Sequence, residues 1–203
     1  MISIDPNTQS ERDIYKLLIG SVVPRPIAFV TTLSEEGVLN AAPFSYFSIL
    51  TSNPPMLSVS VQRKNGTAKD TARNAMRSGE LVIHIVDEDN VEAVNETAAN
   101  LPPDESELDR TNLTPVVSEV VKVPGVLESK IRMECVLEQV VTLNGADQLP
   151  AADLLIARVV RFHVSEELYE QGRIDAAKLK PVSRMAGNIY SALGEMFTIE
   201  RPV

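Results

Sequence analysis

Apolar and polar residues alternate along several short segments of the chain, which is the two-residue repeat of β-strands. Residues Met56–Val61 read MLSVSV, so their serines share one face of a predicted strand. Residues Pro26–Leu33 are rich in β-branched and aromatic side chains and end at the turn-forming sequence Ser34–Gly37. A second strand is expected to begin at Val38 and to run through Leu50, which makes these two segments a hairpin.

Three further segments have the β-rich composition of strands: Leu81–Val86, Val126–Leu143 and Asp153–Val164. The last two are separated by the turn-forming pair Asn144–Gly145, so they are expected to pair antiparallel. Pro43 has no N–H to donate to a sheet. It therefore marks an edge, a bulge or a break in the second strand of the hairpin.

Two helices are predicted from apolar spacing and end signals. The first covers residues 67–79, with Thr67 as its N-cap and Gly79 as its stop. The second covers Asp89–Ala99, where apolar residues fall on one face. The charged, proline-containing stretch Leu101–Pro115 follows and is expected to be a mobile loop.

At least six predicted strands and only two helices favour a mainly β fold, an antiparallel barrel with flanking helices, over alternating βαβ units. A length of 203 residues suits a single domain over residues 1–203. The sequence lacks GxGxxG, GxxxxGKS/T and GxSxG, so the usual dinucleotide-binding, phosphate-loop and hydrolase motifs are absent.

The chain is acidic, with 28 Asp and Glu against 19 Lys and Arg, so neither nucleic acid nor an anionic membrane is an expected partner. The single Cys135 and two histidines are too few for a disulfide or a zinc ligand set, and no metal site is expected. Residues Met1–Arg12 lack the features of an export signal, and the apolar runs are too short to span a membrane. A cytoplasmic protein is therefore expected.

Five segments stand out in chain order: VVPRPIAFVTT at 22–32, NAAPFSYF at 40–47, NPPMLSVSV at 53–61, AKDTARNAMRSGELVIHIV at 68–86, and GRID followed by KPVSRMAGNIYS at 172–191. Together they resemble the flavin reductase-like FMN-binding split-barrel family, which includes flavoredoxin-type proteins. The likeness extends from about Val22 to Pro202.

The resemblance implies a Greek-key, antiparallel split β-barrel that forms a homodimer with FMN at the subunit interface. The chemistry then belongs to the flavin, whose isoalloxazine ring accepts a hydride, and no catalytic side chain is assigned. The expected activity is that of a reductase in which NADH or NADPH is the electron donor and a small molecule is the electron acceptor. Two alternatives stay open: a non-catalytic flavin-binding electron carrier, and an enzyme of the pyridoxamine phosphate oxidase type.

The FMN phosphate is expected at the start of the helix over 67–79, where free backbone N–H groups and the positive end of the helix dipole favour an anion. The resemblance implies that Lys69 supplies a counter-charge and Thr71 a hydroxyl donor. Asp70 either joins them or orients Lys69. The alternative interpretation is an ordinary capped helix at the surface.

The segment 40–47 combines a proline with small alanines, so its backbone can approach a flat ligand closely. The resemblance implies that the flavin ring and ribityl chain are bordered by Ala41, Ala42, Pro43, Phe44, Ser45 and Tyr46. Phe47 is expected in the core, and for Phe44 core and site are both open.

Further cofactor-binding candidates lie on other segments. The resemblance brings Thr31, Thr32 and Ser60 toward the phosphate or the ring, although threonine is also simply a good strand residue. Arg25 lies between two prolines in an extended backbone and is expected to contact phosphate or substrate, with an exposed ion pair as the alternative.

Arg184 belongs to a segment that resembles the family's C-terminal Arg-x-Gly-Gly element, with Ala186 in place of the first glycine. Gly187 and Tyr190 accompany it as candidates. Three other residues are interpreted as structural or exposed, and not as ligands or redox centres: His84, His163 and Cys135.

Overall fold

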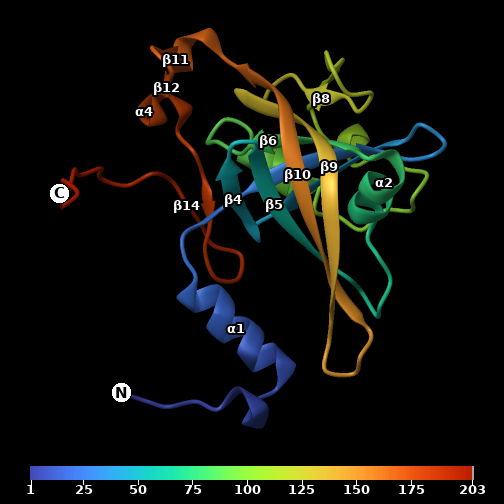
Figure 1. Ribbon diagram of the computed structural model, residues 1–203, viewed down its shortest axis with the longest axis vertical. Coiled ribbons are helices and arrows are strands. Elements are labelled where there is room, and N and C mark those ends of the chain that lie inside the picture. Colours follow the sequence, from blue (N-terminus) through green and yellow to red (C-terminus); the bar gives the residue numbers. More distant parts are fainter. Residues whose placement is uncertain (203) are drawn as a thin grey trace.

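The structure is a computed structural model that describes residues 1–202 (Figure 1). Its main feature is one antiparallel sheet of seven strands in the order β3-β2-β6-β9-β10-β5-β4. These strands are β2 (Ala28–Leu33), β3 (Leu39–Phe44), β4 (Phe47–Ser52), β5 (Pro55–Gln62), β6 (Glu80–Ile85), β9 (Ile131–Asn144) and β10 (Pro150–Val164). The predicted mainly β, antiparallel class is confirmed.

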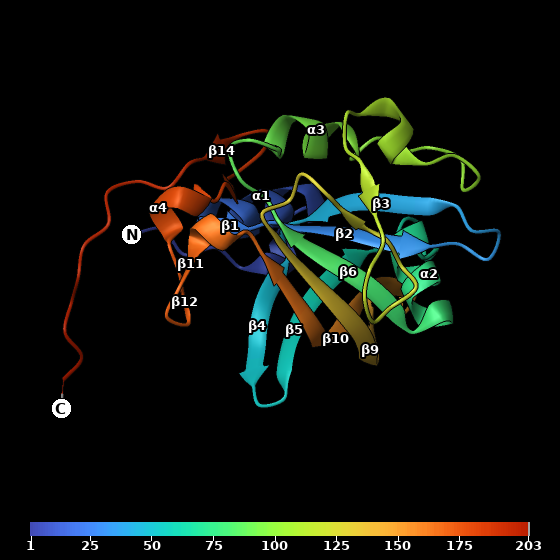
Figure 2. The ribbon, with the colours of Figure 1, turned by 90° about the horizontal axis from the view of Figure 1, so that it is seen from above.

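Short elements surround this sheet. Strand pairs and small sheets are formed by β1 (Arg25–Pro26), β13 (Ser183–Arg184), β14 (Tyr190–Ser191), β7 (Pro115–Val116), β8 (Gly125–Val126), β11 (Tyr169–Glu170) and β12 (Arg173–Ile174). The helices are α1 (Glu11–Ser21), α2 (Asp70–Ser78), α3 (Val91–Glu96), α4 (Ala176–Leu179), and the 3-10 turns η1 (Pro6–Thr8), η2 (Glu107–Arg110) and η3 (Glu166–Leu168). Figure 2 shows α2 and α3 beside the sheet and not between its strands. Along residues 1–202, no helix combines the length and apolar character needed to cross a membrane.

The core is enclosed by the curved sheet and α2. Val30, Ile83 and Leu155 come from three different strands and are fully buried in one cluster, to which Ala72 and Ala75 bring α2. Fully burying a side chain of the size of valine or leucine contributes about 1.5–3 kcal/mol. This cluster therefore fixes the position of α2 relative to β2, β6 and β10.

Helix α2 ends where predicted and begins later than predicted. Gly79 follows it with a left-handed φ of 72°, which a glycine adopts without steric cost. The N-cap is Lys69 and not Thr67, so that part of the prediction is wrong. Thr67 instead exchanges two backbone hydrogen bonds with Lys64, and this tight turn removes it from the helix.

The predicted second strand from Val38 to Leu50 is two strands, β3 and β4, because the chain leaves the sheet at Ser45–Tyr46. Pro43 does not cause this break. It lies inside β3 opposite Phe29, on an edge strand where a missing N–H leaves no neighbour unpaired. The edge interpretation of Pro43 is therefore confirmed.

The long hairpin has other limits than predicted. Strand β9 begins at Ile131, because Gly125–Val126 pairs separately with β7. Strand β10 begins at Pro150, before the expected Asp153, and continues the pairing with β9 almost to the turn. Sequence composition marked the strands correctly but not their ends, which depend on partners distant in the chain.

The helix predicted over Asp89–Ala99 is limited to α3, because the Thr97 hydroxyl donates to the carbonyl of Val94 and the chain turns away. The loop after it was expected to be mobile, yet η2 anchors it against β3. Leu108 and Leu113 of this loop are buried in a second apolar cluster.

Helix α1 has no counterpart among the predicted elements. Its N-cap is Ser10, whose hydroxyl accepts from the N–H of Asp13, a capping pattern that is visible in the sequence. Only Ile19 of this helix is buried, and α1 stands away from the sheet (Figure 1). Tyr15 and Leu18 are exposed on it.

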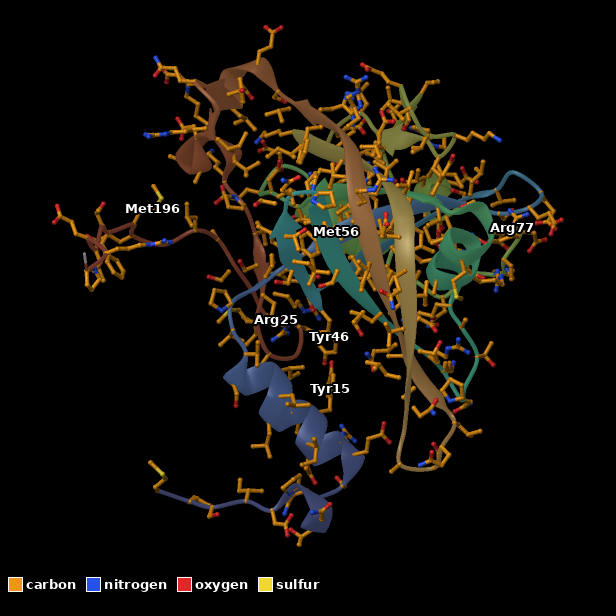
Figure 3. All side chains as sticks on the ribbon, in the orientation of Figure 1. Tyr15, Arg25, Tyr46, Met56, Arg77 and Met196 are labelled. Carbon is orange, nitrogen blue, oxygen red and sulfur yellow. The ribbon has the colours of Figure 1, made fainter. Side chains whose placement is uncertain are left out.

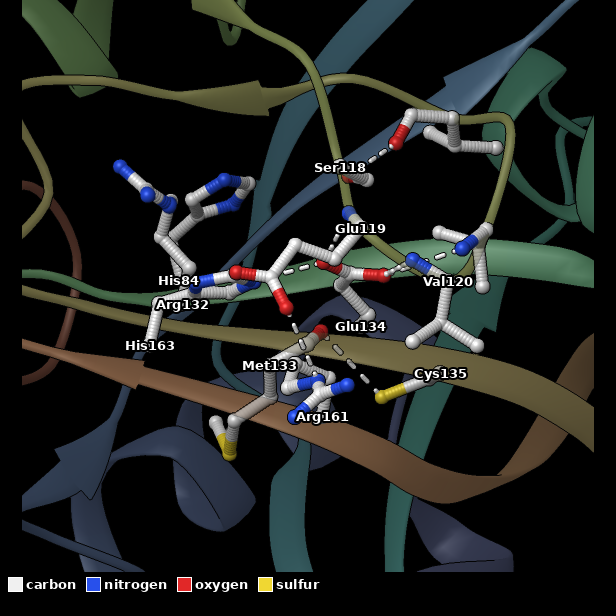
Figure 4. Close-up of polar contacts among 12 residues, drawn as sticks. His84, Ser118, Glu119, Val120, Arg132, Met133, Glu134, Cys135, Arg161 and His163 are labelled. Carbon is white, nitrogen blue, oxygen red and sulfur yellow. Dashed lines mark hydrogen bonds and ion pairs between the residues drawn. The ribbon is translucent and has the colours of Figure 1, made fainter.

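Glu134 on β9 is a buried carboxylate that organises the loop over residues 117–124 (Figure 4). It accepts hydrogen bonds from the backbone N–H groups of residues 119–121 at 2.6–3.0 Å and from His163 Nε2 at 2.6 Å. Burial acts to raise the pKa of this carboxyl, but the donors together lower the pKa to about 2. The carboxylate is thus ionised, and both of its oxygens accept hydrogen bonds within the protein.

Candidate functional site

A cleft of about 380 Å³ opens where α1, the β3–β4 connection, β5 and the β13–β14 hairpin meet. Three cations line it, namely Arg25, Lys69 and Arg184, and no carboxylate does. The chain as a whole carries a formal charge of −9, so this cleft is electrostatically unlike the rest of the molecule. An anionic ligand fits such a lining.

Aromatic side chains line the same cleft from three directions: Tyr15 from α1, Phe44 and Tyr46 from the β3–β4 region, and Tyr190 from β14. Figure 3 shows Tyr15 and Tyr46 approaching each other in the space between α1 and the sheet, with Arg25 beside them. Burial above all, and then the neighbouring Tyr15, raises the pKa of the Tyr46 hydroxyl, which stays protonated at neutral pH. Flat, partly polar surfaces of this kind suit a planar ring system.

The first turn of α2 borders the cleft, and its N-cap residue, Lys69, makes no side-chain capping hydrogen bond. Among residues 1–202 no acceptor is bonded to the backbone N–H groups of Asp70, Thr71 or Ala72, and the Lys69 side chain makes no hydrogen bond or ion pair. A second cavity of about 140 Å³ lies against this turn and shares Pro43, Phe44, Lys69 and Ala98 with the first. Free N–H groups beside an unpaired ammonium are the usual elements of a phosphate site.

Most residues predicted for the site are brought together. The larger cleft is lined by Arg25, Pro43, Phe44, Ser45, Tyr46, Ser60, Lys69 and Arg184. The smaller cavity adds Ala42, Asp70 and Thr71. Phe44 belongs both to the cleft and to the core cluster, and Phe47 packs against that cluster as predicted.

Three predicted residues do not reach either cavity. The hydroxyl of Thr31 donates to the carbonyl of Pro124 at 2.7 Å, and Thr32 is completely buried behind β3. Ala41 is also completely buried, and its N–H donates to Glu107 Oε2. β2 is buried on both faces, so its threonines have only protein partners.

Arg25 lines the cleft, but its guanidinium is committed to the fold. Nη1 donates to the carbonyls of Ile19 at 2.8 Å and Val22 at 2.6 Å, and Nη2 donates to the carbonyl of Met185 at 2.9 Å. Nε reaches the Ser45 hydroxyl at 3.4 Å. Only one of its five N–H groups is left, so the exposed ion pair considered for Arg25 is not formed.

Arg184 is held rigidly at the cleft by two neighbours. Its Nε and Nη2 donate to the carbonyl of Gly187, and its guanidinium carbon lies 4.5 Å from the centre of the Tyr190 ring. Tyr190 in turn donates to Asn95 Oδ1 at 2.8 Å, which ties β14 to α3. Arg184 Nη1 also donates to the Tyr190 hydroxyl, so each terminal nitrogen keeps one free N–H and a planar fork remains for a ligand.

Two residues of the α2 turn have other partners than expected. Asp70 forms an ion pair with Arg73 within the helix and does not orient Lys69. The Thr71 hydroxyl donates inward to Asn40 Oδ1 at 2.7 Å. The Lys69 ammonium is thereby left free, while the hydrogen of the Thr71 hydroxyl is engaged inside the protein.

Other lining residues were not among the predicted ones: Tyr15, Ile19, Ile27, Gln62 and Ala98 in the cleft, and Asn40 and Glu107 in the smaller cavity. Gln62 could have been found by alternation, because Ser58, Ser60 and Gln62 share one face of β5. Tyr15 and Ile19 depend on α1, and Glu107 depends on a contact between a loop and β3. Local sequence carries no signal for those contacts.

His84 and Cys135 lie in the interior, as interpreted from the sequence. His84 Nδ1 bonds to the carbonyl of Phe29 and its Nε2 accepts from the N–H of Val126, each at 2.9 Å. Burial lowers the pKa of His84 to about 4 and raises the pKa of the Cys135 thiol to about 12. Neither residue lines the cleft.

The profile of the flavin reductase like domain family matches residues 19–178. The structure of nitrilotriacetate monooxygenase component B from Bacillus cereus is 62% identical, covers 98% of each chain and superimposes with a TM-score of 0.96. The 2-nitrobenzoate 2-nitroreductase NbaA of Pseudomonas fluorescens is 27% identical over 99% of this chain and 96% of that chain, with a TM-score of 0.88.

A Shewanella frigidimarina protein with a split barrel domain is 20% identical over 100% of each chain, with a TM-score of 0.85. At that identity the likeness concerns the fold alone, and it confirms the predicted split barrel. The family resemblance found from the five segments is confirmed by the profile match. The chain belongs to the flavin reductase like domain family.

Proposed function

We propose that this protein is an FMN-dependent oxidoreductase that takes electrons from NADH or NADPH and passes them to free flavin or another small acceptor. One observation carries the proposal: α2 begins without a cap beside the unpaired Lys69, at the border of a cationic cleft with aromatic walls. The N–H groups and Lys69 suit a phosphate, and the cleft suits a flat ring. FMN combines these two groups in one molecule.

Successive parts of the cleft match successive parts of FMN, from its phosphate through the ribityl chain to the ring. Lys69 and the first turn of α2 would hold the phosphate, and the region from Pro43 to Tyr46 would lie along the ribityl chain and the ring. Arg184, fixed on Tyr190, offers two N–H groups to an electronegative edge of the ring or to a second ligand. When bound, FMN supplies a ring nitrogen that accepts a hydride, and the protein positions it and excludes water.

The relatives support a role in delivering reduced flavin. The Bacillus cereus protein at 62% identity is component B of a monooxygenase, a name that indicates at least one further component. We therefore infer that the electron acceptor of this chain is free flavin, which leaves in its reduced form for a partner enzyme. The nitroreductase at 27% identity makes a nitroaromatic acceptor the second candidate.

A homodimer with FMN at the interface belongs to the same proposal. Apolar side chains are exposed beside the cleft on α1, at its C-cap and on β4, with Leu18 at 55%, Val22 at 60% and Ile49 at 76% exposure. A second copy packed on this surface would cover these side chains and close the cleft. Size-exclusion chromatography with light scattering measures the mass: a dimer of 22.2 kDa chains supports the proposal, and a monomer at micromolar concentration contradicts it.

The decisive experiment begins with the visible absorption spectrum of the purified protein and a titration with FMN. The FMN-loaded protein is then mixed anaerobically with NADH or NADPH in a stopped-flow cell. We expect rapid bleaching of the flavin, faster than with free FMN in buffer. Binding of FMN without bleaching by either nucleotide would favour a non-catalytic electron carrier, and absence of FMN binding would overturn the proposal.

A further inference from the structure

A buried chain of hydrogen bonds lies behind the first turn of α2. Asn40 on β3 is its centre: Nδ2 donates to Glu107 Oε1 at 2.9 Å, and Oδ1 accepts from Thr71 Oγ1 at 2.7 Å and from Thr32 Oγ1 at 3.3 Å. Glu107 Oε2 accepts from the N–H of Ala41 at 2.9 Å. None of the four polar side chains is more than 8% exposed. The chain therefore joins η2, β3, β2 and α2, and three of its members, Asn40, Thr71 and Glu107, form part of the wall of the smaller cavity.

The chemistry of Glu107 sets the direction of every bond in this chain. Burial raises the pKa of the Glu107 carboxyl, while hydrogen bonds from the Ala41 N–H and from Asn40 act in the opposite direction. Both carboxyl oxygens accept, so the part of Asn40 that faces Glu107 is the NH₂ group. The carbonyl of the same amide then faces Thr71 and Thr32, which must both donate to it. A hydroxyl has one hydrogen, so Thr71 has none left for a ligand on its other side.

We propose that Glu107 is a positioning residue that, acting through Asn40, keeps the hydrogen of the Thr71 hydroxyl turned away from the phosphate. As far as the phosphate is concerned, this inference rests on the proposed function. The phosphate is then held by the backbone N–H groups of α2 and by Lys69, without help from the Thr71 side chain. Because Glu107 is part of the loop over residues 101–115, the position of that loop sets the direction in which the Thr71 hydroxyl donates.

Neutralising Glu107 reverses the direction. In Glu107→Gln the new side chain has one acceptor, its carbonyl, and one donor, its NH₂ group. The Ala41 N–H takes the carbonyl, so the NH₂ group faces Asn40, and the Asn40 amide must rotate to present its carbonyl. Its NH₂ group then faces Thr71, whose hydroxyl accepts that bond and gains a free hydrogen for the phosphate. The paired change Asn40→Asp with Glu107→Gln restores the original direction, since the aspartate again accepts from both threonines and from the Gln NH₂ group.

The first test needs no flavin and measures thermal unfolding by circular dichroism. We expect Asn40→Asp to lower Tm, because two carboxylates then face each other, and Glu107→Gln to lower Tm less, because the rotation of Asn40 leaves every group of the chain with a partner. The double variant is expected to recover most of the loss. A double variant that loses as much as the two single variants together would overturn the proposed direction of the bonds, whether or not the protein binds flavin.

The second test compares Kd for FMN and riboflavin, whose ratio reports the phosphate alone. We expect Thr71→Val to leave the ratio of Kd for FMN to Kd for riboflavin within about twofold in the wild-type background and to raise it about tenfold in the Glu107→Gln background, the size of one hydrogen bond to a charged group. An equal effect in both backgrounds would overturn the inference while leaving the proposed function intact. A wild-type protein without preference for FMN would count against the proposed function, and the unfolding test alone would then decide on Glu107 and Asn40.

Discussion

Arg25 Nη2 donates to the carbonyl of Met185 at 2.9 Å, which joins the two ends of the chain across the wall of the cleft. The same guanidinium holds the C-terminal end of α1 through the carbonyls of Ile19 and Val22. Its charge is satisfied by carbonyl dipoles, since no carboxylate is paired with it within residues 1–202. Arg25 thus assembles the walls of the cleft from segments that are otherwise weakly packed.

Arg25→Lys is expected to release α1. Lysine keeps the charge but offers three hydrogens at one point and cannot reach carbonyls on opposite sides, so the variant should lose about 2–4 kcal/mol of stability. Limited trypsin digestion followed by mass spectrometry measures the effect, since Arg12 and Lys16 are cleavage sites on α1. Arg158→Lys, at an exposed ion pair on β10, is the matched control. Equal rates of cleavage in both variants would contradict the role assigned to Arg25.

Lys69→Ala is expected to weaken FMN binding about ten- to hundredfold, because a charge-assisted hydrogen bond to the phosphate is lost. Riboflavin, which has no phosphate, should bind the variant and the wild type equally. Fluorescence titration with both flavins gives the comparison. Lys64→Ala provides the control, since that lysine lies on the tight turn just before α2 and lines neither cavity.

Glu134→Gln is expected to destabilise the fold and to remove part of its acid sensitivity. The folded pKa of about 2 lies below the ordinary glutamate pKa of 4.5, so the carboxylate stabilises the fold above pH 4.5 and this contribution disappears as the pH falls toward 2. The contribution amounts to at most about 3 kcal/mol. Urea unfolding at pH 7 and pH 3 measures it, with the exposed Glu138→Gln as control. A Gln variant with the full acid-induced loss would show that another group is responsible.

His84 predicts a second, higher window of acid sensitivity. The pKa of His84 in the folded protein is about 4, below the ordinary 6.5. Between these pH values the imidazole is protonated in the unfolded chain but not in the folded one, so stability falls as the pH is lowered from 6.5 to 4. A shift of this size corresponds to roughly 3 kcal/mol. His84→Gln should be less stable than the wild type at pH 7, and its free energy of unfolding should not change between pH 6.5 and 4. Urea unfolding at half-unit steps of pH compares the slopes, and parallel slopes would exclude His84.

Cys135 is expected to be unreactive in the folded protein. It is completely buried and burial raises the pKa of its thiol to about 12, so almost no thiolate exists at neutral pH. Labelling with a thiol reagent should require unfolding, and its rate should rise with urea in parallel with the loss of circular dichroism. Fast labelling without urea would mean that β9 opens locally.

The sequence predicted the strands, α2 and most of the candidate site, because alternation, turn residues and the five family segments are local signals. It did not predict that Thr31 and Thr32 are internal. Their burial arises from β3 on one side and from residues near Pro124 on the other, both distant in the chain. Glu107 was missed for the same reason, since an acidic residue in a charged loop has no local mark of its contact with Asn40.

Strands β3 and β4 hold the two outermost places of the seven-stranded sheet, yet only Ser45 and Tyr46 connect them. From Phe44 to Phe47 the backbone can span about 10 Å at most. The Ser45–Tyr46 connection therefore limits the distance between the edge strands β3 and β4. The barrel cannot open further than this where β3 ends and β4 begins. Any widening of the cleft must therefore occur at its other walls, α1 and the β13–β14 hairpin.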